Sequence, residues 1–378
     1  MNALERLREH GQSFWLDNLT RRMLTSGELA RRVTEEGLRG VTSNPAIFHL
    51  AISEGEEYDA DIARFAAEGL DARQVYERLT VADVQGACDV LRPVWAETRG
   101  IDGYVSLEVS PHLAHDTQGT LEEARRLFEA VGRPNVLIKI PGTDAGVPAV
   151  RQSLLEGINV NITLLFSLDA YEAVAAAYLD ALEQRRDTGR RVDDVASVAS
   201  FFLSRIDTET DARLDALAEV ADDETAAPIQ ELRGRAAIAN AKLAYRSFDA
   251  RLAGERWSKL EDAGARPQRM LWASTSTKDP SYPDLKYVEP LIGPWTINTM
   301  PESTAQAFLD HGVVDDTVRR GMGEADDVME GLAHVGVDFD DVTRTLLDEG
   351  VDKFIAPYDR LLESLEGRID ALMAGSTS

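Results

Sequence analysis

The sequence predicts an α/β protein built as a closed (β/α)8 barrel. Three observations support this fold: eight short runs of β-branched and aromatic residues, amphipathic helical patterns between them, and the lack of a low-complexity linker or fixed-length repeat. Strands that alternate with helices build a parallel sheet from βαβ units. Eight uninterrupted units favour a closed barrel over an open, doubly wound sheet. We therefore expect a single domain over residues 1–378.

Each expected strand is short and bounded by turn residues. The eight runs are residues 13–19, 40–44, 104–110, 135–141, 158–166, 195–202, 269–275 and 294–300. Between them, residues 121–132, 145–157 and 168–186 place apolar side chains at helical spacing. These segments therefore supply the expected alternation of strands and helices.

Two regions exceed a minimal barrel. A helical insertion at about 207–265 separates the sixth and seventh strands, and a helical tail occupies about 302–378. The end of the tail, residues 354–373, again has apolar positions at helical spacing. We expect both regions to pack against the barrel or against a partner subunit, and the sequence leaves a homodimer open.

Composition excludes several classes of function. Forty Lys and Arg against 66 Asp and Glu give a net charge of −26, which repels nucleic acid and anionic membranes. A phosphate site would therefore need a local cation. The sequence has no apolar run of membrane-spanning length and no apolar secretory segment at its start. The single cysteine, Cys88, cannot form an internal disulfide, which suits a cytoplasmic location.

Motifs of cofactor sites are missing from the sequence. It contains neither a phosphate-binding P-loop nor a GxGxxG turn after a strand. His112 and His115 stand three residues apart after the third strand but lack a further His or Cys nearby. We therefore expect no cofactor and no metal.

Polar residues interrupt five strands that should be apolar. Barrel strands are buried on both faces and normally consist of continuous apolar runs. Side chains two positions apart on a strand share a face, so each polar set here marks one face. These residues are Asp17, Thr42, Asn44, Ser106, Glu108, Ser110, Lys139, Asn159, Asn161 and Thr163. We expect this polar face to lie inside the barrel, near its C-terminal mouth.

Lys139 is the most informative of these polar residues. A buried ammonium is costly, so the lysine must be ion-paired or lose its proton. A purely structural ion pair with Glu108 or Asp17 is one interpretation. Several polar residues at one level favour a functional site instead, because barrel sites are assembled from several strand ends. A neutral lysine amine attacks carbonyls to form a Schiff base.

The neighbouring polar residues suit a polyhydroxylated substrate. Asp17 and Glu108 are candidate acids and bases that different surroundings would assign to different roles. Asn44 and Asn161 offer donors and acceptors to hydroxyl groups. Asn44 precedes Pro45 and could equally be a turn residue.

Six segments in strand order carry a family resemblance. GVTSNPAIF, VSLEVSP, VLIKIPGT, INVNITLLFS, WASTSTKDP and TINTMP closely resemble the transaldolases of the longer bacterial type. The resemblance implies a TIM barrel of the class I aldolase kind and a cofactor-free reaction of the pentose phosphate pathway. Sedoheptulose 7-phosphate would donate dihydroxyacetone to glyceraldehyde 3-phosphate, giving erythrose 4-phosphate and fructose 6-phosphate.

The same resemblance implies roles for the central residues. Lys139 looks like the Schiff-base lysine, and Asp17 like the group that takes the proton from the C4 hydroxyl. Glu108 and Thr163 look like the pair that positions a water for proton transfers at the imine. The resemblance gives the hydroxyls of the dihydroxyacetone unit to Asn44 and Asn161, and Thr42 belongs to the same expected substrate site.

The phosphate end resembles the family only in part. Ser200 and Arg205 resemble a serine and a phosphate-binding arginine after the sixth strand. On the seventh strand, Ser274 is not followed by the expected arginine two positions on. Lys278 could supply that charge, but as a point charge and not as a bidentate fork.

Two other functions stay open at this stage. Sugar-phosphate aldolases of the same superfamily tend to carry a tyrosine where transferases carry a phenylalanine. Phe202 occupies that position, which favours transfer. A non-catalytic barrel acting as an interaction scaffold is the second alternative.

Overall fold

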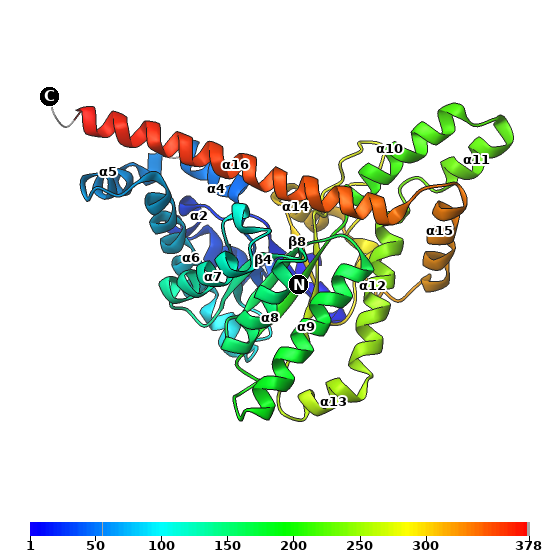
Figure 1. Cartoon of the computed structure of the whole chain (residues 1–378), viewed down its shortest axis with the longest axis horizontal. Coiled ribbons are helices and arrows are strands. Elements are labelled where there is room, and N and C mark those ends of the chain that lie inside the picture. Colours follow the sequence, from blue (N-terminus) through cyan, green and yellow to red (C-terminus); the bar gives the residue numbers. More distant parts are fainter. Residues whose placement is uncertain (55, 376–378) are drawn as a thin grey trace.

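The computed structural model describes residues 1–54 and 56–375, and over these residues the chain forms a closed barrel of eight parallel strands in sequence order (Figure 1). The predicted (β/α)8 fold is therefore confirmed. The strands are β1 (Gln12–Leu16), β2 (Gly40–Val41), β3 (Tyr104–Glu108), β4 (Val136–Pro141), β5 (Val160–Leu165), β6 (Ser197–Phe202), β7 (Arg269–Ala273) and β8 (Thr296–Met300).

Helices surround the barrel and fill its connections. The first half contains α1 (Ala3–Arg6), η1 (Leu7–His10), α2 (Arg21–Thr25), α3 (Glu28–Arg31), η2 (Arg32–Glu36), α4 (Pro45–Glu54), η3 (Glu56–Tyr58), α5 (Asp59–Ala67), α6 (Ala72–Glu97), η4 (Pro111–Leu113), α7 (Thr117–Val131) and α8 (Gly146–Glu156). The second half contains α9 (Leu168–Asp187), α10 (Ser204–Val220), α11 (Asp223–Glu231), α12 (Ala236–Leu252), α13 (Glu255–Glu261), η5 (Glu289–Leu291), α14 (Glu302–His311), α15 (Met322–His334) and α16 (Phe339–Gly375). Among the described residues, no helix is apolar over a length that would cross a bilayer.

The register of the central strands sets the level of the site. Glu108 on β3 pairs with Lys139 on β4, and Lys139 pairs with Asn161 on β5. Paired residues on adjacent parallel strands point to the same face, so these three side chains lie side by side. Strand β1 closes the ring against β8 over five residue pairs.

Close packing at the start of the sheet depends on one glycine. A Cβ added to Gly40 on β2 would stand 2.4 Å from ring carbons of Trp15 on β1. The indole is fully buried and occupies the space that any side chain at position 40 would need. This contact holds β1 against β2, two strands that deliver polar residues to the mouth of the barrel.

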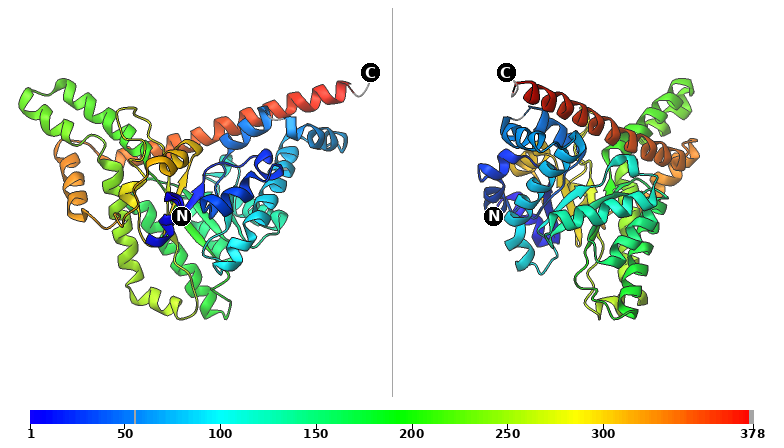
Figure 2. Two further views of the ribbon diagram at one scale, coloured as in Figure 1. Left: turned by 180° about the vertical axis from the view of Figure 1, so that it is seen from behind. Right: turned by 60° about the vertical axis from the view of Figure 1, so that its left-hand side comes forward.

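The helices beyond a minimal barrel lie in two groups. Helices α10 to α13 connect β6 to β7, and α12 packs against α9 and α15. Helix α16 contacts α4, α5, α6 and α10. In Figures 1 and 2 it runs, orange to red, along one edge of the molecule above the barrel. It therefore spans helices from both halves of the chain.

Candidate active site

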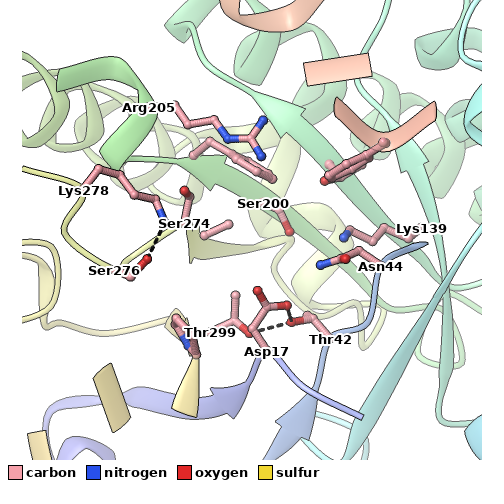
Figure 3. Close-up of a pocket in the computed structure, with 15 residues that line it drawn as sticks. Asp17, Thr42, Asn44, Lys139, Ser200, Arg205, Ser274, Ser276, Lys278 and Thr299 are labelled. Carbon is pink, nitrogen blue, oxygen red and sulfur yellow. Dashed lines mark hydrogen bonds between the residues drawn. The ribbon is translucent and has the colours of Figure 1, made fainter. Parts of the chain in front are cut away.

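Figure 3 shows a cavity at the C-terminal ends of the strands. Its volume is about 240 Å³. Of the twelve site residues predicted from the sequence, ten line it, and Glu108 and Asn161 do not. The ten are Asp17, Thr42, Asn44, Lys139, Thr163, Ser200, Phe202, Arg205, Ser274 and Lys278. These ten residues from six of the eight strands and their following loops therefore meet in one place.

Lys139 reaches the cavity from the middle of β4 while remaining 5% exposed. Its Nζ lies 3.3 Å from Glu108 Oε2 and donates a hydrogen bond of 3.3 Å to the Ser43 carbonyl. The ion pair considered from the sequence therefore exists. It does not compete with the functional interpretation, because the same ammonium also forms part of the cavity wall.

Glu108 lies behind Lys139 and differs from an ordinary carboxylate. Burial raises its pKa to about 7, although the neighbouring Lys139 ammonium opposes that shift. A group that titrates near neutrality can both give and take a proton. Thr163 Oγ1 is buried too and has no hydrogen-bond partner among the described residues.

Asp17 follows β1 and lines the same cavity. Its Oδ1 accepts a hydrogen bond of 2.7 Å from Thr42 Oγ1, which also lies 2.7 Å from Thr299 Oγ1 on β8. Burial raises the pKa of Asp17, and Lys139, the Thr42 hydroxyl and Lys278 oppose the shift. The carboxyl is thus fixed by the Thr42 hydroxyl, which Thr299 holds in turn.

Asn44 both caps a helix and lines the cavity. Its Oδ1 accepts a hydrogen bond of 3.1 Å from the Ile47 backbone amide in the first turn of α4, as a helix cap does. Figure 3 places its amide group beside the Lys139 ammonium at the cavity. The cap fixes the side chain and leaves its NH2 group as a donor to a ligand.

Asn161 lies behind the cavity wall at 0% exposure. Its Nδ2 donates to Ser106 Oγ at 2.9 Å, and its Oδ1 accepts from Ser200 Oγ at 2.6 Å. Ser200 lines the cavity. Asn161 therefore contacts the cavity through Ser200, whereas a direct contact with substrate hydroxyls was expected.

Two cations mark the other end of the cavity. Arg205, at the start of α10, has its Nη1 buried without a hydrogen-bond acceptor among residues 1–54 and 56–375. Lys278, on the β7–β8 loop, donates to Ser276 Oγ at 2.8 Å. Burial lowers the pKa of Lys278, and repulsion from Arg205 lowers it further. Figure 3 shows both side chains directed towards the same space. Two adjacent, partly desolvated cations form a site for an anion.

The backbone at this end is held in an unusual conformation. Ser274 follows β7 with a φ of 55°, in the left-handed region that a residue with a side chain rarely adopts. Its Oγ lies 2.9 Å from Ser204 Oγ, and its carbonyl accepts a hydrogen bond from the Ser204 amide. These bonds fix the loop that carries Lys278 to the start of the helix that carries Arg205.

A buried network supports the same loop from behind. Asp207 on α10 accepts a hydrogen bond of 2.9 Å from the Tyr287 hydroxyl and lies 3.1 Å from Lys286 Nζ. Asp211, one turn later, accepts a hydrogen bond of 2.6 Å from the Tyr282 hydroxyl. The β7–β8 loop is thus tied to α10 at several points, which fixes the separation of the two cations.

Several lining residues were not predicted from the sequence. Ser276, Thr299, Ala273, Pro301 and Phe354 also line the cavity. Thr299 belongs to the quoted TINTMP segment, and the segment WASTSTKDP contains Ser276, so both could have been found there. Phe354 comes from the tail helix α16, for which only packing was expected.

No cluster of His, Cys, Asp or Glu with the composition of a metal site occurs within the described part of the chain. His112, considered above as a ligand, instead places Nε2 2.7 Å from Asp359 Oδ1 on α16. Its ring also packs edge-on against Tyr358. This histidine therefore connects the loop after β3 to the tail helix.

Comparison with known proteins decides the family. A family model described as Transaldolase/Fructose-6-phosphate aldolase matches residues 14–365. The chain belongs to this family. The strand-end segments that suggested the resemblance lie within the matched residues.

Curated relatives match over nearly the whole chain. Transaldolase 2 of Nostoc sp. (strain PCC 7120) is 48% identical over 376 residues, 98% of this chain and 99% of the relative. The transaldolase of Arthrobacter sp. (strain FB24) is 48% identical over 366 residues, 97% of each chain. That of Thermobifida fusca (strain YX) is 46% identical over 371 residues, 98% of this chain and 99% of the relative. The predicted family and the transferase class are confirmed.

We expect Arg205 to contribute more than Lys278 to the affinity for inorganic phosphate. We expect Arg205→Ala to weaken phosphate binding by roughly 10- to 100-fold, because a charge-assisted hydrogen bond contributes about 1.5–3 kcal/mol. Lys278→Ala should weaken it less, because lysine offers a point charge and not a bidentate fork. Phosphorus NMR titration measures both constants. Arg246→Ala, which removes an exposed cation paired with Asp326, controls for net charge. Equal losses in the Arg205 and Arg246 variants would contradict a specific site.

Proposed function

We propose that this member of the family is a transaldolase of the pentose phosphate pathway that forms a Schiff base on Lys139. It transfers dihydroxyacetone from sedoheptulose 7-phosphate to glyceraldehyde 3-phosphate, giving erythrose 4-phosphate and fructose 6-phosphate. One observation carries the proposal: a buried lysine paired with a carboxyl shares a single cavity with two cations, Arg205 and Lys278, and the Arg205 Nη1 is buried without an acceptor among the described residues. A ketose phosphate has a carbonyl near one end and a phosphate at the other. We also propose a cytoplasmic location, where these metabolites would be met.

Imine formation is the first step. The neutral Lys139 amine attacks C2 of the ketose, forming a C–N bond, and a proton of the attacking nitrogen passes to the carbonyl oxygen. Glu108, through a water held between it and Thr163, donates a proton to the resulting hydroxyl, which leaves as water. The pKa of about 7 supports this role, because the carboxyl carries a proton over much of the neutral range.

Carbon–carbon cleavage follows from the iminium. Asp17 takes the proton of the C4 hydroxyl, the C3–C4 bond breaks, and its electron pair moves into the iminium to give an enamine. The aldehyde product then leaves. A new aldehyde acceptor reverses the step: the enamine carbon attacks its carbonyl, and Asp17 returns the proton to the new hydroxyl. Water then adds to the iminium carbon, the C–N bond breaks, and the new ketose leaves with the lysine amine restored.

Substrate hydroxyls and the phosphate are held by the remaining lining residues. Asn44 and Ser200, which line the cavity with Lys139, bind hydroxyls of the substrate in this proposal, and Asn161 orients Ser200 through its hydrogen bond. Arg205 and Lys278 bind the phosphate. Phe202, whose ring centroid lies 5.6 Å from the Arg205 guanidinium carbon, lines the cavity beside Arg205 with an apolar ring.

Borohydride trapping tests the proposed intermediate. We expect incubation with fructose 6-phosphate and borohydride to add the mass of the reduced ketose adduct to the peptide carrying Lys139. Lys139→Ala should abolish the adduct and the transfer of dihydroxyacetone to erythrose 4-phosphate. Lys353→Ala, which removes an exposed lysine of α16, should leave both intact. An active enzyme without an adduct would refute the Schiff base. Release of dihydroxyacetone without an acceptor, at the rate of transfer, would instead identify an aldolase.

Asp17→Asn separates imine formation from cleavage. The amide cannot accept the C4 hydroxyl proton, so we expect cleavage to slow by about 10²- to 10⁴-fold. The trapped Lys139 adduct should still form. Rapid-quench measurement of aldehyde release checks the rate, and mass spectrometry checks the adduct. Thr42→Val, which removes one hydrogen bond to Asp17, should have a smaller effect. Turnover of Asp17→Asn at the normal rate would exclude Asp17 as the base.

The pKa of Glu108 predicts that the rate of imine formation depends on pH. Its protonated form donates to the leaving hydroxyl, and burial places its pKa near 7. The rate of imine formation, followed by quenching in borohydride, should therefore fall as pH rises through about 7. Glu108→Gln should lower the rate and remove this inflection. If the inflection persists in Glu108→Gln, it belongs to another group and the assignment is wrong.

A further inference from the structure

Phe354 brings the tail helix into the cavity. The ring is 7% exposed, and Lys139 Nζ lies 5.4 Å from its centroid, within cation–π range. Other lining residues come from strand ends and the loops after them, 53 or more positions earlier in the sequence. Glu108 approaches the same ammonium from β3. The lysine is therefore covered by a carboxyl from the barrel and by an aromatic ring from α16.

Contacts on both sides of Phe354 fix the helix that carries it. Near its start, Asp341 pairs with Arg213 of α10 at 2.7 Å. Near its end, Arg368 pairs with Asp59 of α5 and donates to the Ile52 carbonyl. Helix α16 is thus anchored to the helical layer at two distant points.

The segment next to Phe354 also sits directly on the barrel. A Cβ added to Gly350 would stand 3.0 Å from the Leu164 side chain, so the helix backbone approaches the end of β5 closely. One turn after Phe354, the Tyr358 ring packs edge-on against Tyr76 of α6 at 5.4 Å. The position of the Phe354 ring over Lys139 is therefore determined by packing before and after it.

The proposed reaction needs such a cover. In transfer, the enamine carbon attacks the acceptor aldehyde, a C–C bond forms, and Asp17 gives its proton to the aldehyde oxygen. Water then adds to the new iminium, the C–N bond breaks, and the product ketose leaves. In the competing route, the enamine carbon takes a proton from water, and water adds to the iminium carbon. The C–N bond then breaks, free dihydroxyacetone leaves, and the lysine amine is restored. Both routes start from one enamine, so bulk water admitted at Lys139 favours release.

We infer that Phe354 is a specificity-determining residue that keeps bulk water from the enamine and so favours transfer over release. The inference rests on the proposed function. The ring covers Lys139 from the side of α16, and the proposed water between Glu108 and Thr163 stays on the side of the barrel. Shrinking the side chain opens the cover and removes the cation–π contact with Lys139, but it leaves Lys139, Asp17 and Glu108 in the chain.

A graded series of variants tests this role. Phe354→Leu, Phe354→Val and Phe354→Ala reduce the apolar cover in steps. With fructose 6-phosphate as donor, we expect the ratio of dihydroxyacetone release to transfer onto erythrose 4-phosphate to rise along the series. The alanine variant should raise it at least about 10-fold. Enzymatic assay of free dihydroxyacetone and of sedoheptulose 7-phosphate gives the two rates, and the borohydride adduct should persist throughout.

Leu361→Ala provides the matched control. Leu361 is fully buried on α16 but does not line the cavity, so its truncation loosens the helix without removing the ring. We expect this variant to keep the wild-type ratio. An equal rise in Leu361→Ala would show that helix packing and not the ring is responsible, and would overturn the inference.

Other outcomes distinguish a failure of the proposed function from a failure of the role of Phe354. A wild-type chain that neither transfers nor forms an adduct on Lys139 refutes the proposed function. A wild-type chain that transfers, with an unchanged ratio in Phe354→Ala, refutes only the role of the ring. If circular dichroism shows that the alanine variant does not fold, the comparison of leucine with valine decides, and equal ratios in these two overturn the inference.

Discussion

The buried ion pair between Lys139 and Glu108 is the constraint on which the site depends. Removing two charges from water is costly, and their attraction repays that cost only when their geometry is good. The register of β3 against β4 supplies that geometry, because it makes the two residues direct neighbours. The Lys139 ammonium does not fully offset the effect of burial on Glu108, so the pKa of Glu108 is raised to about 7. A proton can therefore move at this position near neutral pH, which a fully satisfied salt bridge would prevent.

The two ends of the cavity differ in how their charges are balanced. Near Lys139, an ammonium is balanced by a carboxyl that the barrel itself provides. Near Arg205 and Lys278, two cations repel each other, and the pKa of Lys278 is lowered in part for that reason. Their separation is fixed by Ser274 and by the buried Asp207, both of which tie the β7–β8 loop to α10. A bound phosphate would relieve this repulsion. The arrangement thus concentrates positive charge locally on a chain of net charge −26.

The sequence predicted the barrel and most of the cavity, because polar residues that alternate along a buried strand are costly unless they line a polar site. The sequence did not predict which polar side chains reach the cavity and which lie behind its wall. Asn161 has the same pattern as Lys139 but lies behind Ser200, since the alternation of a strand gives the face of a side chain and not what covers it. Phe354 was missed for a different reason. An aromatic residue on the apolar face of a helix has the pattern of ordinary core packing, and only tertiary structure shows that Lys139 lies beneath it.

The aromatic ring that covers Lys139 comes from the tail helix of the same chain. Phe354 lies 215 positions after Lys139, yet both belong to one chain, so the cover over the lysine does not require a second subunit. Closing a long loop adds little entropic cost per added residue. The anchors at Asp341 and Arg368 can therefore hold α16 across the mouth although the barrel separates them in sequence from their partners. The barrel supplies the reactive groups and the tail helix controls what reaches them, which divides chemistry and water exclusion between two elements that can change independently.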